Sequence, residues 1–444
     1  MKIAIAGYGA EGESNYRYWN KSDNQVVIVD EVRPLRDVPM DASVIIGEDA
    51  FSKLEGYDMV IRTAGLAPRK IKTDGKVWSA TNEFFAKCPA LIIGVTGSKG
   101  KGTTSSLIAS ILKASGRTVH LVGNIGVPAL DVLGDIAADD IVVYELSSFQ
   151  LWDVQKSPHI AVVLMIEPDH LDVHADMEEY VAAKANIRRY QSRDDICLYH
   201  PTNMYARRIA AVDTGVYGGV FTSEEKSAIH RYGVSDDGQV YAENGMFMSD
   251  GVAICSVDAL QLPGEHNIEN ACAAISAAQA TGHVDASAVE QGLRGFIGLS
   301  HRLKFVRMID GVSYYDDSIA TTPGSAIAAM HAFEQPKILI LGGSSKGADF
   351  REVAVVASQT GVKAAVLIGD EASKIEVALR DVGVRAINLG TNVVMPDVVA
   401  CARQLATAGD VVILSPSCAS FGMFKNYSDR GDQFVAAVNA IEES

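Results

Sequence analysis

Short apolar runs alternate with longer amphipathic segments along most of this chain. Val, Ile and Leu dominate the short runs, and many of these runs end in Gly, Asp or Ser. Runs of this kind are typical of strands buried on both faces of a parallel sheet that helices cover. The pattern therefore predicts an α/β fold, with ligands bound beyond the carboxyl ends of the strands.

The apolar runs fall into three groups. A chain of 444 residues exceeds the size at which one hydrophobic core stops growing, so several domains are expected. We expect domains at residues 1–89, 90–297 and 298–444. The expected strands are 2–7, 26–30, 42–47 and 59–65 in the first group; 90–97, 120–126, 141–148 and 159–166 in the second; and 304–318, 337–343, 364–370, 385–390 and 410–417 in the third.

One stretch of the middle group departs from the α/β pattern. Residues 228–257 are polar and punctuated by glycine, which predicts antiparallel hairpins that decorate the second domain. The segment after them, residues 265–282, has the length and composition of a helix.

The composition excludes several functional classes. No apolar run reaches the roughly 18 residues that cross a bilayer, and the start of the chain carries no export signal. The six cysteines are scattered without metal-site spacing, which indicates reduced thiols in the cytoplasm. A formal charge of −16 argues against nucleic-acid binding, and an anionic ligand would need a local cluster of cations or backbone N–H groups.

The segment from Gly94 to Leu112 contains a candidate phosphate-binding loop. A strand, a glycine-rich turn and a helix follow one another, and this arrangement directs backbone N–H groups toward phosphates. Lys101 would hold the β- and γ-phosphates of ATP, and Thr103 or Thr104 would bind the metal because Gly102 occupies the usual hydroxyl position. The alternative is a glycine-rich turn without a ligand.

Acidic residues follow two strands of the same group. Mg²⁺ on a triphosphate needs hard oxygen ligands, and Glu145 ends an apolar strand that should reach the edge where the phosphate loop lies. Another strand ends in a run that contains Glu167, Asp169 and His170, of which His170 is the candidate ligand. The alternative for these groups is helix capping.

The beginning of the chain contains a second glycine-rich turn. Gly7, Gly9 and Gly12 have GxGxxG spacing, and Asp30 ends the next strand. This pattern is typical of a nicotinamide dinucleotide site, although a single match is a weak signal.

Taken in order, ten motifs resemble the Mur ligases, and within that family the branch that adds glutamate. They are GVTGSKGKGTT, VGNIG, ELSSFQL, EPDHLDVH, EEYVAAKANI, GEHNIENACAA, GLSHRL, DDSIATT, GGSSKGADF and LSPSCASFGMFKNYSDRGDQF. The resemblance spans nearly the whole chain and is weakest in the first ninety residues.

This resemblance implies a monomeric, cytoplasmic enzyme of peptidoglycan precursor synthesis that uses ATP and Mg²⁺. It implies a Rossmann-like domain for the UDP substrate, a central ATP-binding domain, and a C-terminal Rossmann-like domain for the amino acid. The implied reaction joins glutamate to UDP-N-acetylmuramoyl-L-alanine through an acyl phosphate. A carboxylate is a poor electrophile, and phosphorylation gives it a leaving group.

The resemblance also implies roles for individual residues. ATP would contact Gly97, Ser98, Lys99, Gly100, Lys101, Gly102, Thr103, Thr104, Asn267, Arg302 and Asp317. The metal would be held by Thr103, Glu145, His170 and Lys184, the last as a carbamate. The UDP substrate would contact Gly7, Gly9, Gly12, Asp30, Arg62, Asn124 and Ser147, and the amino acid Thr321, Lys346, Ser420, Phe421 and Tyr427. The residues implied to act in catalysis are Lys101, His170, Lys184, Arg302 and Lys346.

Some residues depart from the family pattern and keep alternatives open. Ile319 stands where many members have lysine, so D-glutamate is favoured over L-glutamate by frequency alone. Gly102 is shared with folylpolyglutamate synthetases, although that group lacks the glycine-rich first domain. A folate-type ligase is therefore the second hypothesis, and a nicotinamide-dependent oxidoreductase the third. Without the resemblance, Lys184 would be taken for a solvated residue on a helix.

Overall fold

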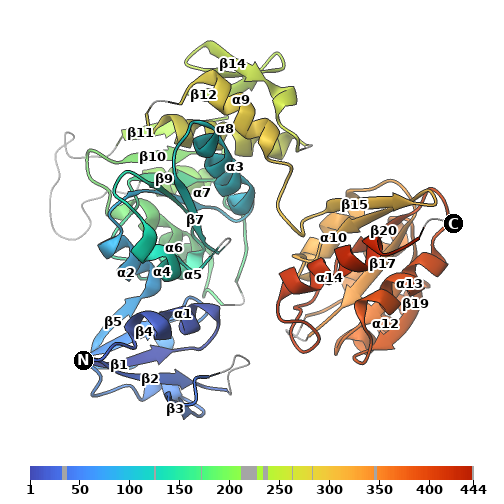
Figure 1. Ribbon diagram of the computed structural model, residues 1–444, viewed down its shortest axis with the longest axis horizontal. Helices are drawn as coiled ribbons and strands as arrows, with labels where there is room; N and C mark the ends of the chain where they lie inside the picture. Colours follow the sequence, from blue (N-terminus) through green and yellow to red (C-terminus); the bar gives the residue numbers. More distant parts are fainter. Residues whose placement is uncertain are drawn as a thin grey trace. The chain divides into compact units, whose positions relative to one another are not determined.

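The computed structural model describes residues 1–32, 38–124, 127–171, 173–211, 228–233, 239–262, 264–282, 284–344 and 348–442. The chain divides into two compact units, Met1–Ile297 and Gly298–Ser444, and each is treated separately below. Both units are built on parallel sheets with helices, which confirms the α/β prediction (Figure 1).

The first sheet lies at the start of the chain and is parallel throughout, with strand order β3-β2-β1-β4-β5. The elements of this part of the chain are β1 (Lys2–Ala6), α1 (Ala10–Trp19), β2 (Gln25–Asp30), β3 (Ser43–Ile46), β4 (Met59–Arg62), β5 (Lys76–Ser79) and α2 (Ala80–Lys87). The four expected strands are present, and β5, which follows a polar stretch, was not predicted.

The second sheet is also parallel, with order β11-β10-β9-β6-β8-β7. Its strands are β6 (Leu91–Thr96), β7 (Val119–Gly123), β8 (Ile141–Glu145), β9 (Ile160–Val163), β10 (Ile196–Tyr199) and β11 (Ala228–Arg231). The helices of this part are α3 (Lys101–Ala114), α4 (Ala129–Val132), α5 (Ser148–Leu151), α6 (Met177–Arg189), α7 (Met204–Ala210), α8 (Glu265–Gln279) and α9 (Ala286–Gly295).

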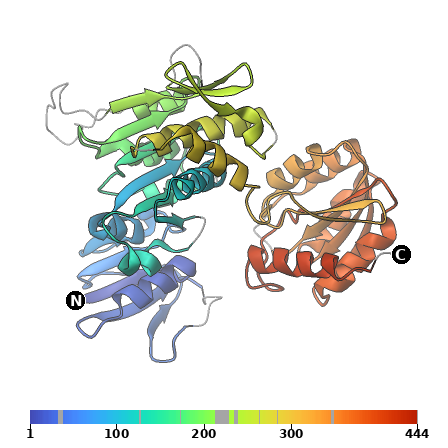
Figure 2. The same cartoon turned by 45° about the horizontal axis from the view of Figure 1, so that its top comes forward.

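The predicted hairpins form a small antiparallel sheet of β12 (Val240–Glu243), β13 (Met246–Ser249) and β14 (Val252–Ser256). Asn244-Gly245 and Asp250-Gly251 connect these strands, and all four residues have positive φ, the requirement of a type I′ turn. The sheet lies against α8 and α9 (Figures 1 and 2). The prediction was wrong for β11, which pairs in parallel with β10 in the main sheet.

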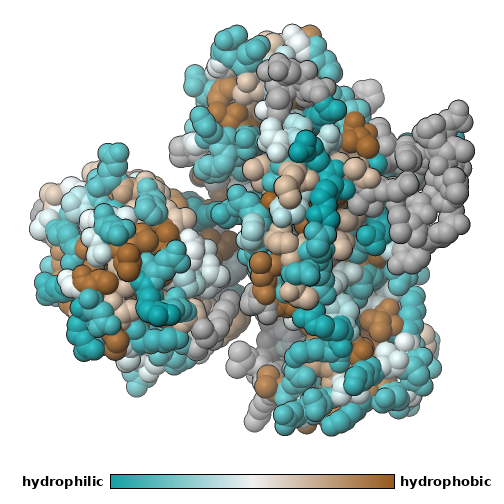
Figure 3. Space-filling model, turned by 180° about the vertical axis from the view of Figure 1, so that it is seen from behind, coloured by the Kyte–Doolittle hydropathy of each residue, from teal (hydrophilic) through white to brown (hydrophobic). Residues whose placement is uncertain are grey.

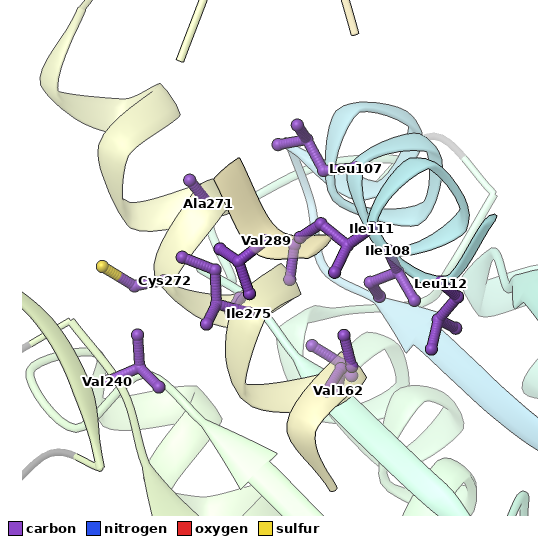
Figure 4. Packing of buried hydrophobic residues seen from close by; sticks show 14 of the residues in the cluster. Leu107, Ile108, Ile111, Leu112, Val162, Val240, Ala271, Cys272, Ile275 and Val289 are labelled. Atoms are coloured by element: carbon purple, nitrogen blue, oxygen red, sulfur yellow. The ribbon is translucent and has the colours of Figure 1, made fainter. Parts of the chain in front are cut away.

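Helices α3, α8 and α9 share one buried core with the second sheet. Leu107 and Ile111 of α3 point toward Ile275 of α8 and Val289 of α9 (Figure 4). Gly292 of α9 allows the close approach, because a Cβ there would lie 2.4 Å from the Cα of Ile111. This packing fixes the N-terminal ends of α3 and α8 beside the same sheet edge.

The second unit contains one sheet with order β15-β16-β20-β17-β18-β19, in which only the β15-β16 pair is antiparallel among the described strands. Its strands are β15 (Lys304–Ile309), β16 (Val312–Asp316), β17 (Lys337–Gly342), β18 (Val362–Ile368), β19 (Arg385–Gly390) and β20 (Val411–Leu414). Its helices are α10 (Pro323–His331), α11 (Arg351–Gln359), α12 (Ala372–Asp381), α13 (Met395–Leu405) and α14 (Tyr427–Asn439).

None of the helices in the described part of the chain is long and apolar enough to cross a membrane. On the face seen in Figure 3, apolar residues form small separate patches among hydrophilic ones.

Candidate active site

The candidate phosphate loop joins β6 to α3 at the carboxyl edge of the second sheet. Gly100 has φ of 82°, and a Cβ there would lie 2.4 Å from Oδ1 of Asn270, so the loop requires glycine at this position. The Lys101 ammonium donates to the carbonyl oxygens of Gly97 and Ser98 at 3.0 and 2.9 Å. The loop therefore carries a cation at its centre and a helix N-terminus behind it, the arrangement that binds phosphates.

Helix α8 meets this loop through two asparagines. Thr104 Oγ1 donates to Oδ1 of Asn270 at 3.2 Å, and Asn270 Nδ2 donates to Oδ1 of Asn267 at 3.3 Å. Asn267, the expected adenine contact, is thus linked to α3. Asn270 was not among the predicted residues, although its spacing of one helical turn from Asn267 was a usable signal. Thr103 is buried beside Thr104.

Glu145 ends β8 with 3% of its surface exposed. The neighbouring strand β7 brings Asn124 to it, and Asn124 Nδ2 donates to Glu145 Oε1 at 3.0 Å. Parallel pairing of β6 with β8 puts the carboxyl ends of these strands at the same edge. The structure therefore places the expected acid and amide beside the phosphate loop.

Lys184 lies on α6 with 1% of its surface exposed, so the interpretation as a solvated lysine is wrong. Its ammonium donates to the carbonyl of Gly97 at 2.9 Å and to Thr96 Oγ1 at 3.3 Å. Burial, reinforced by the nearby charge of Lys101, lowers the pKa of Lys184 well below its ordinary value. A lysine with a depressed pKa is neutral more often, and a neutral amine is the form that adds CO₂.

Tyr180 supports the loop from the same helix and was not predicted. Its hydroxyl lies 2.9 Å from Ser98 Oγ, which also donates to the carbonyl of Glu167 at 2.8 Å. Burial raises the pKa of Tyr180 to about 12, so the hydroxyl stays neutral as a hydrogen-bonding group. Lys99, by contrast, is exposed and forms an ion pair with Glu167 at 3.2 Å.

His170 follows β9 in a left-handed backbone conformation, with φ of 55°. Its ring lies 4.8 Å from that of Phe149, and its side chain is 45% exposed. Across the described ranges, no three His, Cys, Asp or Glu residues form a ready cluster for a metal. The predicted ligand set fits that finding, because it includes a threonine hydroxyl and a lysine that must first be modified.

In the first sheet, the loop between β1 and α1 is closely packed. Gly7 has φ of 93°, and a Cβ on it would lie 2.3 Å from Thr63 Oγ1. A Cβ on Gly12 would lie 2.3 Å from the Gly7 carbonyl oxygen, whereas Gly9 has no neighbouring atom within 4 Å of its Cβ position. Asp30 accepts a hydrogen bond from the Tyr8 N–H at 2.9 Å and so ties β2 to this loop.

This loop borders a cavity of about 340 Å³ between the first and second sheets. The first turn of α1 and the residues after β4 line one side, and Asn124 and Ser147 line the other. Ser147 also caps α5. Two of the expected substrate contacts, Asn124 and Ser147, therefore share one cavity with the first turn of α1, whereas Gly7, Gly9 and Gly12 do not line it.

Arg62 lies beside this cavity but is fully buried. Its Nε and Nη2 each donate to Asp153 at 2.7 Å, and its other contacts are carbonyl oxygens, including those of Leu66 and Phe149. These bonds join the first sheet to the helix that follows β8. A direct contact of Arg62 with the substrate stays a prediction.

In the second unit, the expected ligand residues follow the carboxyl ends of β16 and β20. Asp317 accepts hydrogen bonds from Ser415 Oγ at 2.7 Å and from the Leu303 N–H at 3.1 Å, next to the exposed Arg302. Burial raises the pKa of Asp317 to about 7. Thr321 follows β16, whereas Ser420, Phe421 and Tyr427 follow β20.

Phe421 is 46% exposed, which excludes simple core packing. Lys346 lies outside the described residues.

A buried chain of hydrogen bonds that was not predicted supports this edge. His301 Nδ1 lies 2.6 Å from Asp316 Oδ2, and His301 Nε2 lies 3.0 Å from Ser428 Oγ at the start of α14. Gly431 makes room for the ring, because a Cβ there would lie 2.1 Å from His301 Nδ1. Arg302 and Asp317 directly follow His301 and Asp316 in the sequence. The hydrogen bond between His301 and Asp316 therefore holds the backbone of both expected ligand residues in place.

A phosphate loop with a buried acid and a buried lysine beside it, in an α/β protein, is typical of an enzyme that binds a nucleoside triphosphate. Comparison with known proteins extends this description. The family model described as Mur ligase middle domain matches residues 95–278, and the one described as Mur ligase, glutamate ligase domain matches residues 301–418. The chain belongs to the Mur ligase family, whose members act in peptidoglycan synthesis.

Two curated relatives show which members of the family this chain is similar to. A protein of Acetivibrio thermocellus named UDP-N-acetylmuramoylalanine--D-glutamate ligase is 40% identical over 91% of this chain and 87% of its own length. A protein of the same name from Symbiobacterium thermophilum is 35% identical over 99% of this chain and 98% of its own.

Solved structures share the fold at low identity. UDP-N-acetylmuramate-alanine ligase of Thermotoga maritima has a TM-score of 0.61 at 16% identity, covering 99% of both chains. Folylpolyglutamate synthase of Mycobacterium tuberculosis has a TM-score of 0.57 at 15% identity, covering 82% of this chain and 95% of its own.

Proposed function

We propose that this protein joins D-glutamate to UDP-N-acetylmuramoyl-L-alanine through an acyl phosphate, with release of ADP and phosphate. The names of relatives at 40% and 35% identity support the choice of both substrates. The observation that carries the chemistry is the phosphate loop at Lys101, with Glu145 and Lys184 buried beside it. Transfer of a phosphoryl group from ATP to the substrate carboxylate would occur there.

The side chains around the loop would divide the work. Lys101 would exchange its bonds to Gly97 and Ser98 for phosphate oxygens, which carry more negative charge than carbonyls. Asn124 holds Glu145 in a fixed orientation from the adjacent strand. Preorganised groups of this kind stabilise the charge that develops in phosphoryl transfer without further rearrangement.

Mg²⁺ would be held by Thr103, Glu145, His170 and a carbamate on Lys184, and when bound it would offset the negative charge of the triphosphate. The position of Lys184 supports this assignment, because a buried amine with a lowered pKa reacts with CO₂ to give an anionic oxygen ligand. The ammonium form could not serve as a ligand.

The amino acid would bind at the carboxyl edge of the sheet in the second unit, near Thr321, Ser420, Phe421 and Tyr427. Lys346 would form an ion pair with a carboxylate of the amino acid. Residues 1–89, 90–297 and 298–444 would act as the substrate, ATP and amino-acid domains of a monomeric cytoplasmic enzyme. Arg302 and Asp317 would contact ATP. Because Ile319 replaces a common lysine, the stereochemical preference needs a direct measurement.

The test is phosphate release by the whole chain with ATP and Mg²⁺. We expect release only when UDP-N-acetylmuramoyl-L-alanine and D-glutamate are both present. L-glutamate in place of D-glutamate tests the stereochemistry, and a folate with L-glutamate tests the competing function. Release that depends on the folate would overturn the proposal, as would equal rates with both glutamate enantiomers.

A further inference from the structure

The cavity beside the first glycine-rich loop contains an acidic residue that the proposed reaction does not use. We infer that Glu11 sets the affinity for the UDP-linked substrate, because only its protonated form admits the substrate diphosphate into this cavity. The inference rests on the proposed function and identifies a specificity-determining residue within it.

Glu11 lies in the first turn of α1 and is partly buried. It lines the cavity together with Ala64 and Gly65 of the first domain, and Asn124 and Ser147 face them from the second. Its carboxyl also accepts a hydrogen bond from the backbone N–H of Ala64. The carboxyl therefore occupies one backbone donor in the cavity wall, the Ala64 N–H.

The charges around Glu11 leave its carboxylate without full compensation. Arg62 is the cation that acts on it from β4, but both Nε and Nη2 of Arg62 are bonded to Asp153 at 2.7 Å. Asp131 of α4, which accepts from Ser14 in the cavity wall, is paired with Arg17 at 2.7 Å. Tyr144 of β8 faces the same cavity, and burial raises the pKa of its hydroxyl.

Burial raises the pKa of the Glu11 carboxyl to about 7, against the opposing effects of Arg62 and the Ala64 N–H. The acid and its conjugate base therefore coexist near neutral pH. The ionised form would repel phosphate oxygens in the same cavity, whereas the neutral form donates a hydrogen bond to them. Substrate binding should consequently take up a proton above pH 7.

Glu13, in the same helical turn, provides a control that separates a role of Glu11 in binding from a purely structural role. Glu13 is also acidic and near the N-terminus of α1, where a negative charge favours the helix. It forms an ion pair with Arg17 at 2.8 Å and does not line the cavity. Glu13→Gln therefore removes a comparable charge without altering the cavity.

The experiment measures the dissociation constant of UDP-N-acetylmuramoyl-L-alanine by calorimetry at pH 6, 7 and 8. Both phosphates of this compound are esterified, so its charge is constant over this range. For the wild-type protein we expect affinity to fall roughly tenfold from pH 6 to pH 8, as one required proton with a pKa near 7 dictates. Glu11→Gln should change less than about twofold, and Glu13→Gln should follow the wild type.

Each other outcome overturns the inference. A Glu11→Gln variant with the wild-type pH profile shows that the carboxyl does not control binding, although the proposed function stands. Weaker binding by this variant at every pH shows that the ionised form is the one required. Absence of binding by the wild-type protein at any pH overturns the inference and the proposed function together.

A second measurement does not depend on a variant that folds. Titrations of the wild-type protein in two buffers of different ionisation enthalpy report the protons taken up on binding. We expect about one proton per substrate at pH 8. No uptake would overturn the inference.

Discussion

The two glycine-rich loops of the first unit have similar backbones and opposite charges. Each joins a parallel strand to a helix, and each needs a glycine with positive φ, Gly7 in one and Gly100 in the other. The loop after β6 contains Lys101, with the buried Lys184 nearby, whereas the loop after β1 leads to Glu11. If both loops bind phosphates, as we propose, their backbones offer similar N–H groups, and the difference between them lies in the charge of the side chains.

The difference in charge between the two loops matches the two ligands that we propose for them. A triphosphate that must react needs fixed positive charge, because negative charge moves during transfer. A substrate that must be bound and later released as product needs only moderate affinity, and a neutral carboxyl is compatible with that requirement. The following changes test the distinction from the largest expected effect to the smallest.

Lys101→Ala should reduce substrate-dependent phosphate release by about 10³-fold, because the central cation of the ATP loop is lost. Binding of UDP-N-acetylmuramoyl-L-alanine in the other cavity should be unchanged. The control is Lys113→Ala, an exposed lysine in the last turn of the same helix, which should retain activity. Steady-state rates and calorimetric affinities give both readouts, and a joint loss in substrate affinity would contradict the separation.

Lys184→Met should lower the rate by about 10²-fold, because methionine fills similar space but cannot form a carbamate. The melting temperature should change little, since the loss of the hydrogen bonds to Gly97 and Thr96 is offset by removal of a buried amine. The measurement pairs steady-state rates with a melting curve. Full activity in a folded variant would show that Lys184 has only a packing role.

Gly7→Ala should destabilise the protein by about 3 kcal/mol, because the new methyl group would collide with Thr63 in a left-handed backbone. Gly9→Ala in the same loop should cost about 1 kcal/mol or less, because its Cβ would meet open space and only the N-cap preference for glycine over alanine is lost. Urea unfolding of both variants provides the comparison. Equal costs would mean that the loop is not as tightly built as its contacts indicate.

Glu11→Gln should stabilise the first unit at high pH. The folded pKa, about 7, lies above the ordinary value of 4.5, so the favourable contribution is present below pH 4.5 and is lost as pH rises through 7. We expect the variant to exceed the wild type by about 3 kcal/mol at pH 8 and to match it near pH 4.5. Urea unfolding at the two pH values measures this, and a constant difference would exclude titration of Glu11 as the cause.

Much of the fold could be predicted because apolar runs with polar ends mark strands of parallel sheets. Strand β5 could not, since its flanks are polar, and β11 was assigned to the wrong sheet because pairing depends on distant strands. For the site, spacing predicted a phosphate-binding role for Lys101, whereas the burial of Lys184 depends on the packing of α6 and could not be predicted. Glu11 occupies a variable position of GxGxxG, so its place in the cavity required the structure.

A crystal of the full chain soaked with ADP and UDP-N-acetylmuramoyl-L-alanine tests the central claim most directly. We expect the β-phosphate of ADP about 3 Å from Lys101 Nζ, and the diphosphate of the UDP substrate in the cavity between Glu11 and Asn124. The account would be contradicted by ADP in that cavity, or by either ligand bound elsewhere with its loop empty.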